Sequence, residues 1–106
     1  MDYVTRIAQL IRAELDPGML PDGPIDDLLQ LYAVLALTLG QDVCAADVHD
    51  AWVAWMARRN ISHEALVPFD ELDKDTAAED TPFVMAIRAV AEAQRVGRGR
   101  PRSLGG

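Results

Sequence analysis

Residues 28–39 read LLQLYAVLALTL, a run with very few polar side chains. We expect a helix here. It should begin near residues 24–27, where a proline and two aspartates suit a first turn, and end before Gly40. A helix that is apolar nearly all round lies at the centre of a bundle or in an oligomer interface. The stretch therefore predicts a helical core and leaves a homodimer open.

Three further segments repeat apolar residues at helical spacing: residues 2–15, residues 45–59, which carry both tryptophans, and residues 81–96. No segment alternates between apolar and polar with the period of two that a half-buried strand would show. The predicted fold class is all-α. We expect a compact four-helix domain with an irregular, proline-containing crossing between the third and fourth helices.

The chain has 106 residues, enough for one domain with a modest core. We assign this domain to residues 1–96. The remaining residues, 97–106, read GRGRPRSLGG and are rich in glycine and arginine. Such a composition cannot bury enough apolar surface to fold, so we expect a disordered tail.

The charge is unevenly distributed along the chain. The formal net charge is −7, but residues 1–94 hold 6 basic and 17 acidic side chains, a net of −11. An acidic body repels phosphate, so nucleic acid could bind only through the tail. There Arg98-Gly99-Arg100-Pro101 resembles the core of an AT-hook, which lies in the narrow minor groove of A·T-rich DNA. The candidate nucleic-acid residues are Arg98, Arg100 and Arg102.

The chain has one cysteine, Cys44, which excludes an internal disulfide and suits a reducing compartment. The longest apolar stretch is near residues 28–39, shorter than the roughly 20 residues that span a bilayer. The N-terminus lacks the basic and apolar regions of a signal peptide. We expect a cytoplasmic protein with no membrane partner.

Neither catalysis nor metal binding is predicted. Cys44, His49 and His63 lack the spacing of a zinc site. Residues 73–84 resemble a calcium loop at first sight, but alanine and valine stand at three of its defining positions. Ser62 and His63 are adjacent, a poor arrangement for a nucleophile and its base. We therefore expect no enzyme activity, no cofactor and no metal.

Residues 63–72 read HEALVPFDEL, an apolar segment broken by Pro68. Proline keeps the residue before it extended, so this segment should cross from the third helix to the fourth. We expect it to pack between the two helices as an internal clip. A shallow pocket beside it would join aromatic and polar side chains, as small-ligand sites do. The candidate ligand residues are His49, Trp52, Arg59, His63 and Phe69.

Within residues 48–94, the strings VHDAW (48–52) and HEALVPFDEL (63–72), followed by Asp80, resemble the ryanodine-receptor repeat domain. Its pattern is I-H-E-x-W on a helix and H-P-x-L-V-P-[YF]-x-x-L in a loop. Glu64 stands where that family prefers proline, and the stretch between Trp52 and His63 is shorter. The whole chain is also similar to short proteins of actinobacteria and their phages that carry this half-repeat.

The resemblance implies a small binding or regulatory module without catalysis, which acts through a protein partner or a small ligand. Two alternatives stay open. One is a sensor of a nucleotide-like ligand, which would use the pocket beside residues 63–72. The other is a DNA-associated accessory protein, which would act through the arginine tail.

Overall fold

The computed structural model describes the backbone of residues 2–21 and 23–105, and the side chains of residues 2–21 and 23–96. The all-α prediction is confirmed: the described residues form four long helices and no strand. A five-residue helix and three single turns of 3-10 helix connect them. The elements are α1 (Tyr3–Glu14), η1 (Pro17–Met19), α2 (Asp26–Leu39), η2 (Gly40–Asp42), α3 (Ala45–Arg58), η3 (Phe69–Glu71), α4 (Lys74–Ala78) and α5 (Thr81–Gly105).

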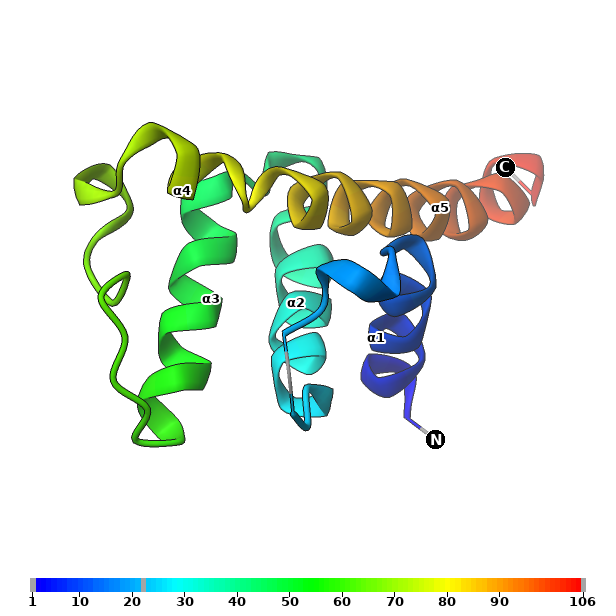
Figure 1. The fold of residues 1–106 in the computed structure, drawn as a ribbon. Helices are drawn as coiled ribbons and strands as arrows, with labels where there is room; N and C mark the ends of the chain where they lie inside the picture. The colour runs from blue at the N-terminus through cyan, green and yellow to red at the C-terminus, as the bar shows by residue number, and fades with distance from the viewer. Residues whose placement is uncertain (1, 22, 106) are drawn as a thin grey trace.

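Helices α1, α2 and α3 stand side by side, and α5 lies across one end of all three (Figure 1). The nearly apolar helix α2 occupies the centre, because it contacts α1, α3 and α5. The largest wholly buried side chains come from all four long helices and from Val43, in the short connection before α3. They are Tyr32, Ile7, Ile11, Leu28, Leu29, Ile87, Val43 and Val48.

Local signals account for several helix ends. The Asp2 carboxylate accepts a hydrogen bond from the Thr5 backbone N–H at 2.7 Å and caps α1. Gly40 ends α2, as the sequence predicts, with φ +58°, and Asn60 follows α3 with φ +56°. At the start of α3, Asp47 Oδ2 accepts a hydrogen bond from the Cys44 backbone N–H at 2.9 Å. This contact supplies the carboxylate half of a capping box.

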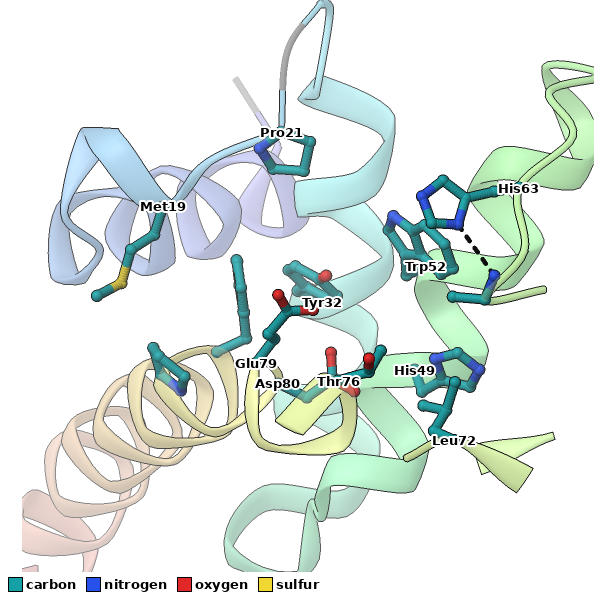
Figure 2. A pocket seen from close by; sticks show the side chains of 13 residues that line it. Met19, Pro21, Tyr32, His49, Trp52, His63, Leu72, Thr76, Glu79 and Asp80 are labelled. Carbon is teal, nitrogen blue, oxygen red and sulfur yellow. Dashed lines mark hydrogen bonds between the residues drawn. The ribbon is translucent and has the colours of Figure 1, made fainter. Parts of the chain in front are cut away.

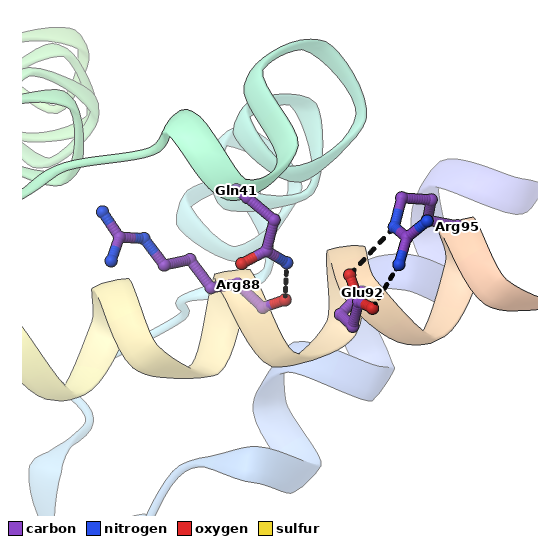
Figure 3. A network of polar contacts seen from close by, with 4 residues as sticks. All are labelled: Gln41, Arg88, Glu92 and Arg95. Carbon is purple, nitrogen blue, oxygen red and sulfur yellow. Dashed lines mark hydrogen bonds and ion pairs between the residues drawn. The ribbon is translucent and has the colours of Figure 1, made fainter.

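Polar contacts tie the connection between α2 and α3 to α5 (Figure 3). The Arg88 guanidinium donates to the Val43 carbonyl at 2.8 Å. In return, the Gln41 side-chain amide donates to the Arg88 carbonyl at 2.8 Å. These two bonds hold the connection against the middle of α5. One turn beyond Arg88, Glu92 and Arg95 form an exposed ion pair, with 2.6 Å between Oε1 and Nη2.

The proline-containing crossing, residues 61–72, runs back along α3 on the outside of the molecule (Figure 1). None of its residues is buried, although Ile61 and Leu66 pack against the core. The 61–72 segment therefore does not pack between α3 and α5 as the expected internal clip. The segment covers α3 instead, because α5 starts only after η3 and α4 and lies across the helix ends.

Helix α5 continues to Gly105, whereas the sequence pattern predicted an end near Val96. The side chains of residues 97–106 lie outside the described residues, and the expectation of a disordered tail stays a prediction. In the part of the chain that the structure describes, no helix combines the length and the apolar character needed to cross a bilayer.

Candidate functional site

A pocket of about 470 Å³ opens between α2, α3, the 61–72 segment and the junction of α4 with α5 (Figure 2). Met19 and Pro21, in the loop before α2, line its far side. The pocket brings together segments that are far apart in the sequence. It exists because α5 crosses the helix ends and α4 closes the angle between α2 and α3. The pocket has an aromatic side and an acidic side.

The aromatic side is built on α3. His49 and Trp52 are one turn apart on this helix, and their ring centroids lie 5.7 Å apart. The ring of His63, on the 61–72 segment, stands edge-on to Trp52 at 5.3 Å and 89°. Trp52 is half-buried and faces the pocket together with both histidines. Three rings thus form one wall.

His49 fixes the 61–72 segment to α3. Its side chain is only 3% exposed, and its Nε2 lies 2.6 Å from the Val67 carbonyl oxygen. A carbonyl can only accept a hydrogen bond, so this contact assigns the proton to Nε2. Phe69 packs on the same imidazole, at a centroid distance of 6.0 Å. His49 therefore lines the pocket and also holds the 61–72 segment against α3.

His63 is held by its own turn. Its Nδ1 accepts a hydrogen bond from the Ala65 backbone N–H at 3.0 Å. The residue is exposed, and Nδ1 is occupied by this contact. Nε2 is the nitrogen that remains to meet a ligand at the pocket entrance. The local turn presets the orientation of the ring.

The acidic side centres on Asp80, the residue before α5. Its carboxyl is half-buried in the pocket, and this burial raises its pKa to about 6. His49 lowers that pKa and Glu79 raises it, both to a smaller extent. Nearby, burial and the charge of Asp80 raise the pKa of the Tyr32 hydroxyl far above its ordinary value. Perturbed groups of this kind concentrate at functional sites.

Tyr32 connects the acidic side to the core. The residue is 2% exposed, and its ring packs against Phe83 at 5.7 Å between centroids. No hydrogen bond to its hydroxyl or to the Asp80 carboxylate occurs among the described residues. In the same part of the chain, no fully buried side-chain nitrogen or oxygen lacks a partner. Both groups must therefore be open to the pocket.

Of the predicted ligand residues, the structure brings His49, Trp52 and His63 together in the pocket. It places the other two elsewhere. The exposed Arg59 lies at the far end of α3, where its guanidinium covers the Trp55 ring at 4.5 Å. Phe69 is behind His49 and does not line the pocket. Phe69 lies there because the 61–72 segment runs along the outside of α3.

Sequence reasoning missed Tyr32, Glu79 and Thr76 as pocket residues, and it noted Asp80 only as part of a family pattern. A tyrosine in an otherwise aliphatic helix was the available signal, because a buried hydroxyl needs a partner or a cavity. The sequence could not show which carboxylates line the pocket, because residues 73–80 are rich in aspartate and glutamate and only some of these side chains face it. Their position depends on how α4 packs.

Other candidate chemistry is not assembled in the part of the chain that the structure describes. No group of three or more histidine, cysteine or carboxylate side chains is placed to hold a metal ion there. Cys44 is exposed, and its Sγ lies 3.2 Å from Asp47 Oδ2. Residues 73–84, compared above with a calcium loop, form α4 and the start of α5. The side chains of Arg98, Arg100 and Arg102 lie outside the described residues.

Comparison with known proteins identifies one family. A family model described as "Domain of unknown function (DUF7701)" matches residues 2–92. The match includes every residue of the pocket and stops before the arginine tail. No curated protein and no solved structure matches the chain.

Proposed function

The chain belongs to the DUF7701 family, a domain of unknown function, and we propose that it is a non-catalytic binding module whose ligand site is the pocket between α2, α3 and the α4–α5 junction. The module would act on a small ligand or on one side chain of a partner protein. The lone cysteine and the acidic body favour a cytoplasmic setting.

The observation that carries this proposal is the pocket itself. Its volume of about 470 Å³ falls within the range of small-molecule sites, roughly 300–1,000 Å³. Aromatic rings make up much of its wall, and a few polar groups converge on it from three elements. Apolar surface with a small number of placed polar groups is the usual composition of a ligand site.

The chemistry of the lining supports binding rather than catalysis. In the described part of the chain, no serine or cysteine lines the pocket, and the only hydroxyls in the lining are those of Thr76 and Tyr32. His49 donates its Nε2 proton to a backbone carbonyl, so that nitrogen is not available as a base. A nucleophile with a base in hydrogen-bond reach is what covalent catalysis requires. The lining offers no such pair.

A nucleotide-like ligand, the alternative considered from the sequence, receives less support. Trp52 could stack on a base. However, Glu79 and Asp80 line the pocket, whereas no lysine or arginine within residues 2–21 and 23–96 does so. A phosphate would therefore meet carboxylates without a counter-charge. Among nucleotide-like ligands, only an uncharged nucleoside would therefore suit this lining.

A ligand screen tests the proposal. Thermal shift, followed by calorimetry, should find at least one binder in a library of small cations, sugars, nucleosides and nucleotides. Trp52→Ala should weaken that binder about tenfold or more, because it removes the largest ring of the wall. Met85→Ala is the control, since Met85 is 62% exposed on α5 and outside the pocket. A screen with no binder, or a binder indifferent to Trp52→Ala, would contradict the proposal.

A further inference from the structure

We propose that the pocket selects an organic cation, either an ammonium or a guanidinium group, and that Asp80 is its counter-ion. This inference rests on the proposed function and adds the chemical class of the ligand. It does not depend on the resemblance to the ryanodine-receptor repeat. The charge of the lining, its unpartnered polar groups and its aromatic rings all favour such a ligand.

The charge of the lining is of one sign. Among the residues whose side chains are described, Glu79 and Asp80 line the pocket, and no lysine or arginine does. Asp80 is half-buried, and its carboxylate receives no hydrogen bond from the described residues, unlike the carboxylates of Asp2 and Asp73, which cap helices. A carboxylate withdrawn from water without donors is costly unless a positive group approaches it. A bound cation would supply the missing partner.

The rings of the lining favour the same ligand. Tyr32, Trp52 and Phe83 come from α2, α3 and α5, and all three line the pocket. The π-faces of tryptophan and tyrosine attract alkylammonium and guanidinium groups, most strongly when water is excluded. The Tyr32 hydroxyl, on a side chain that is 98% buried, also opens into the pocket. Its oxygen can accept a hydrogen bond from a cationic N–H donor.

Competing ligand classes leave part of this lining unused. An anion would be repelled by both carboxylates. A neutral apolar ligand would bury Asp80 further without pairing it. The described residues do not provide three ligands for a metal ion at any point. Of these ligand classes, only an organic cation would pair with the carboxylates and also interact favourably with the aromatic rings.

A matched pair of probes separates charge from shape. Choline and its neutral carbon isostere, 3,3-dimethylbutan-1-ol, have nearly the same size. Agmatine supplies a guanidinium group, and adenosine monophosphate supplies an anion with a stacking base. Titration calorimetry should show that choline or agmatine binds about 30-fold more tightly than the neutral isostere. The nucleotide should not bind.

The source of the cation is distinguished by a further probe. A synthetic peptide of residues 97–106 carries three arginines and no acid. If the peptide binds while choline and agmatine do not, the proposal holds and the cation is an arginine side chain. Helix α5 is 25 residues long, or roughly 37 Å. An arginine at its far end would then have to come from a second copy of the chain.

Two variants tie binding to the carboxylate. Asp80→Asn should weaken cation binding at least tenfold, whereas Asp75→Asn should leave it unchanged because Asp75 is exposed on α4 and outside the pocket. Affinity of the unaltered protein should fall from pH 8 to pH 5, because Asp80, whose pKa is raised to about 6, takes up a proton in this range. The other titratable groups that line the pocket with Asp80 are His49 on α3, His63 on the 61–72 segment, Tyr32 on α2 and Glu79. In Asp80→Asn most of this pH dependence should disappear.

The outcomes are decisive in both directions. Equal binding of choline and its isostere, or cation binding that survives Asp80→Asn, would overturn the cation proposal. Binding of a nucleotide or sugar, lost in Trp52→Ala, would overturn it while leaving the proposed binding module standing. The absence of any binder would overturn both.

Discussion

The half-buried Asp80 carboxyl provides an acidic group for the proposed ligand site but lowers the stability of the fold when it is ionised. Burial raises its pKa from 3.8 to about 6, so the folded state holds a proton that the unfolded state releases between these values. Stability therefore falls as pH rises from about 4 to about 6, and the penalty persists above pH 6. Asp73 is the opposite case, because a hydrogen bond from the Thr76 backbone N–H lowers its pKa.

This contrast predicts opposite effects for two conservative substitutions. Asp80→Asn should unfold at a higher urea concentration than the unaltered protein at pH 8, and the difference should vanish near pH 4. Asp73→Asn should unfold earlier at pH 8, because a neutral cap replaces the charged carboxylate at the start of α4, and that loss should shrink as pH falls through the lowered pKa of Asp73. Urea titrations across this pH range measure both. A destabilised Asp80→Asn at pH 8 would mean that the charged carboxylate has a partner.

Phe69 provides a second test at the residue scale, because its sequence context predicts a core residue and its position does not. Its ring is half-buried and rests on His49. Phe69→Ala should cost about 1–2 kcal/mol, below the ~3–5 kcal/mol typical of a fully buried phenylalanine. Ile87, with no exposed area, is the reference, and Ile87→Ala should cost ~2–5 kcal/mol. If Phe69→Ala destabilises the protein more than Ile87→Ala does, the 61–72 segment packs as part of the core, contrary to this expectation.

Among the helices, sequence patterns were informative wherever the relevant physics is local. The predicted bounds of α1, α2 and α3 agree with the structure within a residue or two, because caps and apolar spacing act within a few turns. The path of residues 61–72 was not accessible in this way. Its apolar letters and Pro68 indicate packing, but the partner surface depends on where α5 lies, and no local signal carries that information.

The turn at the end of α2 yields a prediction about backbone conformation. Gly40 has φ +58° and ψ −123°, a combination that residues with a side chain avoid. A Cβ added there would meet nothing within 4 Å, so any cost would come from the backbone alone. We expect Gly40→Ala to destabilise the protein by ~1–3 kcal/mol in urea unfolding.

Gly18 is the matched control for this turn. A Cβ there would make an ordinary 3.5 Å contact with Asp16 Oδ1, and φ lies outside the positive region. Gly18→Ala should therefore be neutral or slightly stabilising, since alanine restricts the unfolded chain. Equal effects of the two substitutions would show that the conformation of Gly40 is not required by the turn.

On the scale of the whole molecule, the site was predictable only in part. His49, Trp52 and His63 could be selected from sequence because they lie on or beside one helix and one loop. Tyr32 and Asp80 line the same pocket only because α2, α3 and the α4–α5 junction pack together. No local sequence pattern predicts this packing. The resemblance to the ryanodine-receptor repeat stays a prediction, as does DNA contact through the arginine tail.

The position of α2 also bears on oligomeric state. The apolar character of α2 predicted either the centre of a bundle or an oligomer interface. In the fold, α2 contacts α1, α3 and α5, so its place at the centre of the bundle accounts for this character. Among the described residues, only Val34 and Leu39 remain as exposed large apolar side chains on α2. Stable interfaces bury about 800 Å² per partner, far more than these two side chains provide. The net charge of −11 over residues 1–94 further opposes self-association.

We therefore expect a monomer, to be measured by size-exclusion chromatography with light scattering at about 100 µM protein. The homodimer left open by the sequence would instead give twice the 11.6 kDa chain mass. If so, Val34→Glu should restore the monomer by placing a charge on the remaining apolar strip of α2. Met85→Glu, at a still more exposed position on α5, should leave the dimer intact. A dimer sensitive to Met85→Glu and not to Val34→Glu would place the interface on α5 and remove α2 from consideration.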